Sequence, residues 1–374
     1  MILVLNCGSQ SIKWKLFDLD LKVVKEGKCV VLNQKIFQKS LEDELKKIDG
    51  KKIDAVGHRV VHGKDVFREP TIITEENIQK LEALNDLAPL HNPFNVLGIK
   101  ICQRIFEGVP QIAVFDTEFF KDLPERVFTY ALPDEIVKEF GFRRYGFHGI
   151  SHEYVAKKAC EILEEQAKKV HPVKYRGAVI SAKPKLFDRA RIITCHLGGG
   201  SSITAIKNGK AVDTSMGFTP MQGLVMMTRA GDMDSGVVLE LVREFTLDKA
   251  NEILNKGSGI KGICGEEDML KVLERVKSGD AKAKLAFDVF VYSIKKYIGA
   301  YYAILGGCDV LAFTGSIGSG FSITRDTICK DLSILKMPTA KPSSMRDGKA
   351  IGTKVLAIET DEELAIAQKI LINK

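Results

Sequence analysis

The stretch of sequence that decides the fold spans residues 191–234 and reads RIITCHLGGGSSITAIKNGKAVDTSMGFTPMQGLVMMTRAGDMD. It opens with a short apolar run, Ile192 to Cys195, of the kind that forms a buried strand. Three glycines, Gly198 to Gly200, follow, and a second alternating run, Ile203 to Ile206, leads to the hairpin signal Asn208-Gly209. The glycines therefore lie at a turn between two strands, whereas dinucleotide-binding and P-loop motifs place a helix after their glycines.

The glycine turn has the composition of a phosphate-binding loop. Glycines let several backbone N–H groups point at one anion, and Ser201 and Ser202 add hydroxyl donors. For GGGSS alone, an ordinary hairpin turn is an equal alternative. Downstream, Arg229, Asp232 and Asp234 add a guanidinium and two carboxylates, a set suited to phosphate and magnesium.

The composition predicts a soluble globular protein. The 374 residues suffice for two domains, and 45% are hydrophobic and 28% charged. No apolar run approaches the roughly 20 residues that span a bilayer, and the N-terminus lacks the basic region of a signal peptide, so we expect no membrane association. The eight cysteines have no CxxC and no regular spacing, which favours reduced thiols in the cytoplasm. The net charge of +7 suits a small anionic substrate, and no aromatic-interleaved basic run indicates nucleic acid.

The first residues of the chain repeat the strand–turn–strand design. Met1 to Asp18 read as an apolar strand, a Gly/Ser turn and an alternating strand. In the second half, Ala281 to Leu305 predicts a long amphipathic helix, Gly257 to Gly265 a glycine-rich loop, and Asp309 to Gly320 a strand that runs into a further backbone cradle. We therefore expect an internal duplication, with two like α/β domains facing each other across a cleft.

A few polar residues at strand ends are further candidates. Arg59, at the end of a strand and before a glycine turn, suits an anion clamp, whereas His58 and His62 lie four apart in a strand and do not converge on a metal. Asp116 ends the apolar run IAVFD, where α/β sheets place functional residues, although a helix-capping aspartate has the same pattern. His148, between glycines, is by itself a weak signal.

The whole chain resembles the acetokinase family. The matching segments occur in order from one end to the other: LNCGSQSIKWKLF, VGHRVVHG, LAPLHNPFN, FDTEF, RRYGFHGISH, ITCHLGGGSS, VDTSMGFTP, TRAGD, FTGSIG and TDEELAIA. The resemblance implies an α/β fold of two related actin-like (ribonuclease H-like) domains flanking an active-site cleft. The first domain is expected over residues 1–149, with the closing helix 360–374 packed against it. The second, expected over 150–359, binds nucleotide and forms a homodimer.

The resemblance also implies a reaction: reversible, in-line transfer of the γ-phosphoryl group of ATP to acetate, giving acetyl phosphate and ADP, with Mg²⁺ (or Mn²⁺) as the metal. Acetate is already an anion at neutral pH, with a carboxyl pKa of about 4 to 5, so no strong base is needed. The difficulty lies in holding one anion against a polyanion and stabilising the transferred group, which requires preorganised positive charge.

Individual residues take roles by matching the family's motifs. The catalytic residues implied are Asp116, His148 and Arg229, and the metal ligands are Asn6 and Glu362. Arg59 would hold the acetate carboxylate or the phosphoryl group, and a small apolar pocket for the acetate methyl would be lined by Val61, Leu90, Phe147 and Pro220. The nucleotide-binding positions implied are Ser9, Ser11, Lys13, His196, Leu197, Gly198, Gly199, Gly200, Ser316, Ile317 and Gly318. Lys13 has the alternative of a solvated strand residue.

The segments expected near the adenine depart from the family pattern. Gly199 replaces an asparagine, Ser319-Gly320 replaces a Glu-Asn pair, and Lys271 ends a segment that lacks the family's arginine. Two alternatives therefore stay open: an enzyme that uses pyrophosphate or another donor with acetate or propionate, and a catalytically weak nucleotide-binding homologue. The joint presence of Arg59, Asp116, His148 and Arg229 argues against the second.

Overall fold

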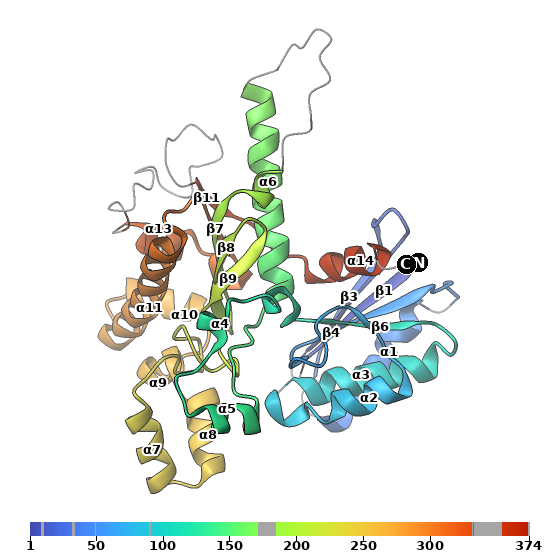
Figure 1. Cartoon of the computed structure of the whole chain (residues 1–374), viewed down its shortest axis with the longest axis horizontal. Coiled ribbons are helices and arrows are strands. Elements are labelled where there is room, and N and C mark those ends of the chain that lie inside the picture. The colour runs from blue at the N-terminus through green and yellow to red at the C-terminus, as the bar shows by residue number, and fades with distance from the viewer. Residues whose placement is uncertain are drawn as a thin grey trace. The chain divides into compact units, whose positions relative to one another are not determined.

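The computed structural model describes residues 1–8, 11–31, 34–48, 50–89, 91–170, 185–330, 332 and 354–372. The chain divides into two compact units (Figure 1). The first comprises Met1–Lys121, Phe147–Tyr154 and Asp361–Lys374, and the second Asp122–Gly146 and Val155–Thr360. This division differs from the boundary expected at residue 149. The reason is that residues 122–146 bond to the second unit: Tyr145 N donates to Gly217 O at 3.0 Å, and the Arg144 side chain donates to Thr214 O at 3.1 Å.

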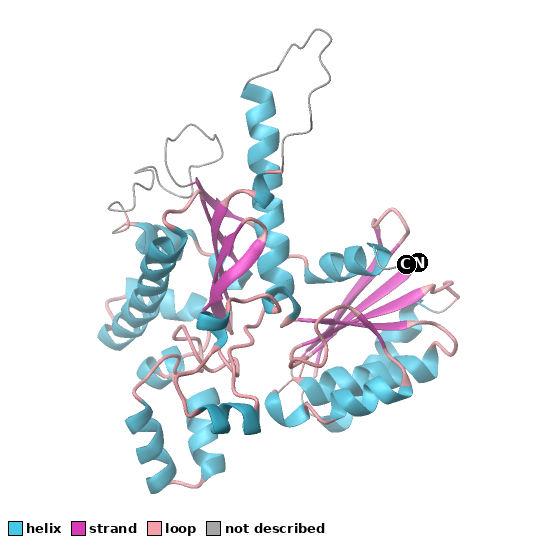
Figure 2. Cartoon of the chain, viewed as in Figure 1, coloured by secondary structure: helices cyan, strands magenta, loops and turns pink. Residues whose placement is uncertain are grey.

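A six-stranded sheet forms the centre of the first unit, in the order β3-β2-β1-β4-β6-β5. Figure 2 shows the strands of this sheet in magenta. Its strands are β1 (Ile2–Cys7), β2 (Ser11–Phe17), β3 (Val23–Val30), β4 (Ala55–Val60), β5 (Thr71–Ile72) and β6 (Gln111–Phe115). The first three strands form an antiparallel meander, β4 and β6 continue the sheet in parallel with β1, and β5 is an antiparallel edge strand. The turn expected between β1 and β2 is closed by the bond from Gly8 N to Ser11 O, 2.9 Å long.

The second sheet repeats this topology with five strands, in the order β9-β8-β7-β10-β11. Its strands are β7 (Arg191–Leu197), β8 (Ser201–Lys207), β9 (Lys210–Thr214), β10 (Val310–Thr314) and β11 (Lys354–Ala357). Again a meander of three antiparallel strands is followed by two strands parallel to the first. The matching order and direction confirm the duplication expected from the two hairpins.

Helices cover both faces of the first sheet. They are α1 (Gln34–Leu45), α2 (Glu75–Glu82), α3 (Asn92–Ile105), the start of α6 (Gly149–Val170) and α14 (Glu362–Ile372), with short 3-10 turns η1 (Lys46–Ile48), η2 (Asn85–Leu87) and η3 (Glu118–Phe120). Because side chains alternate along a strand, Leu3 and Leu5 of β1 pack toward α1 and α3, whereas Ile2 and Val4 pack toward α14 and the start of α6. Figure 1 shows α14 and α3 on opposite sides of this sheet. Both faces are therefore buried, as the nearly continuous apolar sequence of β1 requires.

The second unit is built around α11 (Ala281–Leu305), which begins and ends as predicted. Buried side chains of α11 and of β7, β8 and β10 share one hydrophobic core, which includes Phe290, Ile294, Ile193, Ile203 and Phe313. The other helices of this unit are α4 (Glu125–Phe128), α5 (Asp134–Phe140), the rest of α6, η4 (Leu186–Asp188), α7 (Ser235–Glu244), α8 (Leu247–Lys256), α9 (Gly259–Cys264), α10 (Met269–Lys277), α12 (Gly315–Gly318) and α13 (Ser322–Cys329).

One predicted loop is wrong. Residues 257–265 contain the helix α9, in which Ile260 and Cys264 are buried in the core beside α11. The packing of these two side chains outweighs the low helix propensity of the glycines, and Gly265 ends the helix in the left-handed conformation, with φ +77°. Among the described helices, none combines the length and apolar character needed to cross a bilayer.

Candidate active site

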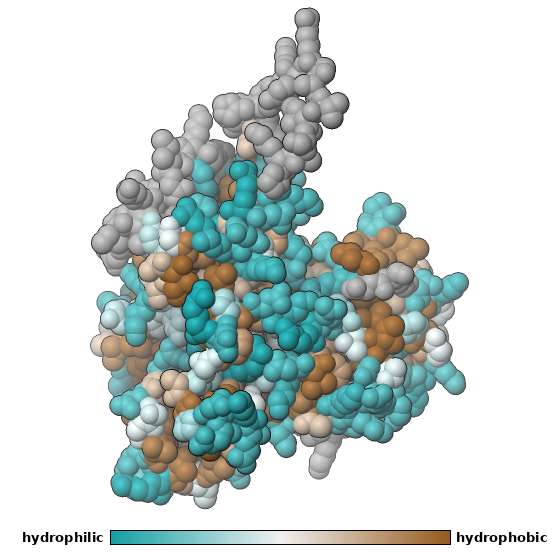
Figure 3. All heavy atoms as spheres, viewed as in Figure 1, coloured by the Kyte–Doolittle hydropathy of each residue, from teal (hydrophilic) through white to brown (hydrophobic). Residues whose placement is uncertain are grey.

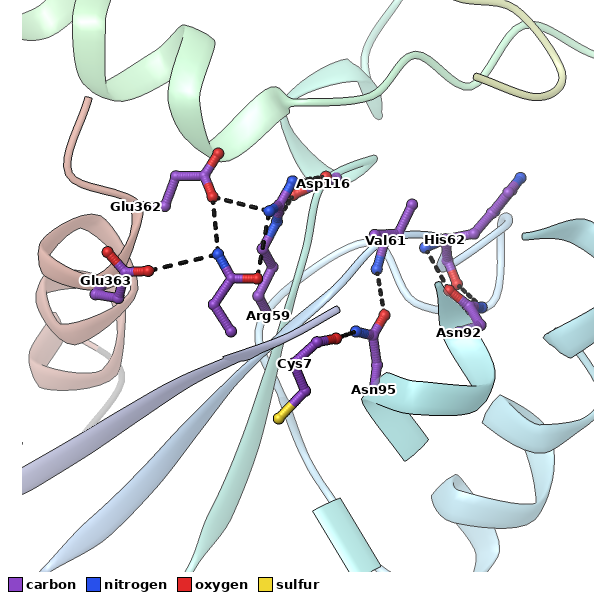
Figure 4. Close-up of polar contacts among 10 residues, drawn as sticks. Cys7, Arg59, Val61, His62, Asn92, Asn95, Asp116, Glu362 and Glu363 are labelled. Carbon is purple, nitrogen blue, oxygen red and sulfur yellow. Dashed lines mark hydrogen bonds and ion pairs between the residues drawn. The ribbon is translucent and has the colours of Figure 1, made fainter. Parts of the chain in front are cut away.

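An ion pair between two parallel strands lies at the centre of the first unit's polar cluster. Arg59, on β4, donates from Nε to Asp116 Oδ1 at 2.9 Å and from Nη2 to Asp116 Oδ2 at 2.7 Å (Figure 4). Asp116 directly follows β6, and its N–H donates to Val60 O at 2.9 Å, which extends the ladder between the strands. Because both groups sit at the carboxyl ends of parallel strands, the sheet itself positions them.

The N-terminus of α14 brings two more carboxylates to this pair. Arg59 Nη1 lies 2.9 Å from Glu362 Oε2, and Asn6, on β1, donates from its amide to Glu362 at 3.2 Å and to Glu363 at 3.4 Å. The side chains of Asp116 and Glu362 are only 1% and 10% exposed. Acidic residues are favoured in the first turn of a helix. The structure thus brings together Asn6, Arg59, Asp116 and Glu362, four of the residues to which the family resemblance assigns roles.

The cluster carries more negative than positive charge. Burial by itself lowers the pKa of Arg59, but the charges of Asp116 and Glu362 outweigh burial and raise that pKa. Burial raises the pKa of Glu362 to about 7, while Arg59 opposes the shift and Asp116 adds to it. Lys13 stands opposite Asn6 in the β1–β2 pairing, and its charge also favours ionised Glu362. Asp116, Glu362 and Glu363 face one guanidinium and the ammonium group of Lys13, so negative charge is in excess when Glu362 is ionised.

These oxygen donors fit magnesium. Mg²⁺ binds through one or two carboxylates and completes its coordination with water and substrate phosphates. In the described parts of the chain, no three His, Cys, Asp or Glu side chains are arranged to hold a metal by themselves. A divalent cation next to Glu362 would also offset the surplus charge of the buried carboxylates. Asn6 and Glu362 are therefore suitable ligands.

His148 stands at the entrance to α6, held close to Asp116. Its backbone has a φ of +58°, which side-chain-bearing residues rarely adopt, and such strained positions cluster at functional sites. The next residue, Gly149, donates its N–H to Asp116 O at 2.9 Å, and a Cβ added there would lie 2.3 Å from that oxygen. Only glycine therefore allows α6 to begin against the end of β6.

An apolar wall adjoins the charged cluster. The side chains of Val61 and Phe147 are buried, and the Phe147 ring meets the edge of His62 at a centroid distance of 5.2 Å. Two predicted site residues, Ser9 and Leu90, lie outside the described residues. Ser11 begins β2 and is partly exposed. The structure therefore places two of the four residues expected around the acetate methyl in the first unit.

Two buried asparagines of α3 hold the backbone of Val61 and His62, and the sequence pattern did not single them out. Asn95 donates to Cys7 O at 2.6 Å and accepts from Val61 N at 3.1 Å, so it ties β1 to the residues after β4 (Figure 4). Asn92 accepts from His62 N and donates to His62 O, both at 3.0 Å. The signal in the sequence was two asparagines three residues apart in a segment otherwise suited to a buried helix.

The second unit holds Arg229 and Pro220 in one loop. Arg229 Nη1 donates to Pro220 O at 3.1 Å. Burial lowers the pKa of Arg229, and within the described residues it makes no ion pair. The carboxylates that the sequence suggested for magnesium have structural partners instead. Asp232 accepts from Gly223 N at 3.0 Å and from the Tyr297 hydroxyl at 2.5 Å, and Asp234 accepts from Gly236 N at 2.7 Å at the start of α7.

Eight of the residues predicted to bind nucleotide lie in the second unit, at the end of β7 and the turn after it, and in a short helix next to that turn. His196 and Leu197 end β7 and lead into the turn Gly198–Gly200, and Ser316, Ile317 and Gly318 lie in α12 after β10. A Cβ added to Gly315, whose φ is +78°, would lie 2.4 Å from Leu197 O. Arg325, buried on α13, donates to Gly318 O and Ser319 O, both at 2.8 Å. Gly315 thus lets the start of α12 lie against the end of β7, and Arg325 holds the end of α12 in place.

The comparisons with known proteins agree over nearly the whole chain. The model of the acetokinase family matches residues 32–368. The chain is 40% identical to the acetate kinase of Parabacteroides distasonis, covering 98% of this chain and 97% of that protein. It is 41% identical to the acetate kinase of Dictyoglomus thermophilum, with 98% of each covered.

Solved structures give the same result. The crystal structure of Porphyromonas gingivalis acetate kinase matches with a TM-score of 0.83 and 37% identity, covering 100% of this chain and 99% of that one. A propionate kinase from Francisella tularensis subsp. tularensis SCHU S4 matches with a TM-score of 0.81 and 34% identity, covering 98% of each. Together with the duplicated topology, these matches confirm the predicted α/β class with two related domains.

Proposed function

The chain belongs to the acetokinase family, and from that premise we propose that it transfers the γ-phosphoryl group of ATP reversibly to acetate, giving acetyl phosphate and ADP. It is an enzyme, a phosphotransferase with a carboxylate acceptor. The observation that carries the proposal is the partly buried Arg59, held in plane by Asp116 and Glu362, with the buried apolar residues Val61 and Phe147 close to Arg59 and His148 in the sequence. A fixed cation beside an apolar surface suits a small carboxylate with a methyl group.

Acetate binding is assigned to Arg59 and this wall. A guanidinium carries more N–H groups than the contacts to Asp116, Glu362 and Asn6 use, so a donor remains for the acetate carboxylate. Val61, Phe147, Leu90 and Pro220 are the proposed surroundings of the methyl group. One extra methylene changes the preference of such a pocket by about 1–3 kcal/mol, so propionate is a plausible second substrate.

Phosphoryl transfer requires positive charge placed in advance. Acetate attacks as the anion that it already is, so the residues need only orient it and stabilise charge on the transferred group. Arg229 and His148 are the proposed donors to the equatorial oxygens, and Asp116 keeps Arg59 oriented throughout. Magnesium, held by Asn6 and Glu362, supplies charge neutralisation of the phosphates when bound.

ATP is assigned to the glycine turns of the second unit, with Lys13, Ser9 and Ser11 contributing from the first. Backbone N–H groups of Gly198–Gly200 and of residues 316–318 suit phosphate oxygens, because glycines leave the backbone accessible. No observation favours pyrophosphate or another donor over ATP, and the family match supports ATP.

Acyl-phosphate formation, trapped with hydroxylamine, tests the proposal. Purified protein is incubated with Mg²⁺ and acetate, and with ATP, GTP or pyrophosphate in parallel, and Asp116→Asn serves as the inactive control. Product with ATP that is lost in Asp116→Asn supports the assignment. Product with pyrophosphate alone replaces the donor, and no product with any donor refutes the kinase.

A homodimer formed through the second unit is also proposed. Supporting it, α7 buries none of its residues and exposes apolar side chains, with Leu239 71% exposed, and hydrophobic atoms gather over α7 and α8 in Figure 3. Monomers rarely leave large apolar patches open. Light scattering on Leu239→Asp is expected to show a monomer, whereas Leu19→Asp, in an exposed turn of the first unit, stays dimeric. A dimeric Leu239→Asp protein would refute this interface.

A cytoplasmic location is the last part of the proposal. It is supported by the eight cysteines, all of them described in the structure and none joined in a disulfide, as expected of a reducing compartment.

A further inference from the structure

A partly buried lysine on α14, Lys369, has two carboxylate partners on two other elements. Lys369 Nζ lies 2.7 Å from Glu118 Oε1 and 2.9 Å from Glu153 Oε2. The three side chains are 19%, 10% and 17% exposed, respectively, so this is not a surface ion pair. A charge held this far from water costs free energy unless it is paired, and here one cation pairs with two anions.

The three elements joined by Lys369 are the ones that carry the candidate site. Glu118 opens η3, two residues after Asp116, and Glu153 lies in α6, five residues after His148. Lys369 itself is on α14, seven residues after Glu362, and residues two helical turns apart share a face of a helix. One ammonium group therefore links the segments that present Asp116, His148 and Glu362.

The helix that carries Lys369 packs tightly against the sheet. The same helix presses Ile366 and Ile370 against β4 so closely that a Cβ added to Gly57 would lie 2.5 Å from Ile370 Cδ1. Gly57 is two residues before Arg59 on that strand. Burial alone lowers the pKa of Lys369, but the charges of Glu153 and Glu118 outweigh burial and raise that pKa, so the lysine stays charged.

Stability by itself is a weak reason for a buried ion cluster. Replacing such a cluster with apolar groups of similar volume is often neutral or stabilising. The presence of the cluster therefore suggests that it fixes the positions of the elements that it joins. The role indicated by the connections of Lys369 is the fixing of α14, η3 and α6 relative to one another within the first unit.

We propose that Lys369 is a positioning residue of the phosphoryl-transfer site, which holds Asp116, His148 and Glu362 in register through Glu118 and Glu153. This inference rests on the proposed function, because those three residues are the ones assigned to the reaction. Lys369 touches no substrate, so it acts on turnover through the elements that it joins.

Steady-state kinetics of Lys369→Met and Lys369→Arg test the proposal. Lys369→Met, which keeps the length of the side chain but not its charge, is expected to lower kcat by on the order of tenfold or more, as the loss of groups that orient site residues does. Lys369→Arg restores most of this loss. Lys100→Met, which removes an exposed partner of Glu82 in the same unit, is the matched control and keeps wild-type kcat.

A double-mutant cycle separates positioning from a merely structural role. In a Glu362→Gln background, Lys369→Met is expected to lower kcat less than it does in the wild type, because the position of Glu362 is part of what Lys369 secures. A Lys369→Met protein with a lower Tm but an unchanged kcat per folded molecule would overturn the proposal.

Two further measurements keep the outcomes distinct. If Lys369→Met does not fold, Glu153→Gln, which neutralises only one of the two partners, replaces it, and an unchanged kcat in that variant refutes positioning. If the wild type forms acetyl phosphate and Asp116→Asn does not, while Lys369→Met is fully active, the Lys369 proposal alone fails. If the wild type itself forms no acyl phosphate with any donor, the proposed function fails first.

Discussion

Arg59 and Asp116 meet across neighbouring parallel strands in a two-point ion pair, with Nε–Oδ1 and Nη2–Oδ2 distances of 2.9 and 2.7 Å. This fork-to-carboxylate geometry holds the guanidinium plane as well as its charge, and no other side chain reproduces it. The cation is therefore oriented before any substrate arrives, which is the condition under which charge stabilises a transition state efficiently.

The two-point geometry makes lysine a poor substitute for Arg59. Arg59→Lys keeps the charge but cannot grip both oxygens of Asp116, so kcat/KM for acetate is expected to fall by on the order of a hundredfold. Arg104→Lys, at an exposed pair with Glu42, is the control and should behave as the wild type. Activity of Arg59→Lys within a few-fold of the wild type would show that the charge alone suffices.

Substitution of Arg229 should lower the activity without lowering the stability. Removing a partly buried guanidinium that has no ion-pair partner among the described residues relieves a desolvation cost, so Arg229→Ala is expected to keep or raise the Tm. Its turnover should nevertheless fall by on the order of a hundredfold, because the charge that it provides to the transferred group is lost. Arg243→Ala, on the exposed side of α7, should change neither quantity. A large fall in Tm with normal turnover would mean that Arg229 serves the fold.

Glycine at position 149 is expected to be essential. The added methyl of Gly149→Ala would lie 2.3 Å from Asp116 O, so either α6 or the end of β6 must move. We expect a loss of about 1–3 kcal/mol in unfolding free energy, measured by denaturant titration, together with a fall in kcat. Gly299→Ala, in the middle of α11 with nothing within 4 Å, should instead gain up to about 1 kcal/mol. Equal effects of the two substitutions would contradict the packing described.

His58 predicts a specific dependence of stability on pH. Burial lowers its pKa from the ordinary 6.5 to about 4, although the bond to Gln111 opposes the shift. Between these values the unfolded chain binds a proton that the folded chain does not, so the unfolding free energy falls as the pH falls from 6.5 toward 4. The loss is about 3 kcal/mol over that range.

The variant His58→Gln has no such proton to bind. Denaturant unfolding at several pH values should therefore give a shallower acid limb for the variant than for the wild type, whatever their stabilities at pH 7. Parallel curves for the two proteins would show that His58 is not the group responsible.

The sequence predicted the parts of the fold that depend on local pattern. The two strand–glycine–strand units, the long helix α11 and the strand before Asp116 follow from hydrophobic period and turn residues, which act over a few neighbours. The helix α9 was missed because its glycines disfavour a helix locally and only the burial of Ile260 and Cys264 favours one. The allocation of residues 122–146 to the second unit depends on bonds to Gly217 and Thr214, about 70 residues away in sequence, and no local pattern reports these.

For the site, the family resemblance pointed to residues for which the sequence pattern alone was weak evidence. The structure added the residues that hold those side chains in place. Asp116 and His148 had plain alternatives in the sequence, whereas their link through Gly149 is visible only in three dimensions. Asn95 and Lys369 look like polar exceptions in apolar helices. Their partners lie on other elements, so no spacing rule identifies them.

The discontinuous first unit has a consequence for how the protein is made. Its sheet is encoded in the first 121 residues, but the helix that covers Ile2, Val4 and Val114 on one face lies at residues 362–372. On the ribosome, the part of that face which α14 covers stays open to water until residues 362–372 have left the exit tunnel. The growing chain therefore exposes this apolar surface for most of its synthesis. Intermediates with such exposed surface are prone to aggregation. Since Glu362 begins the same helix, the charged cluster forms only once α14 has been translated.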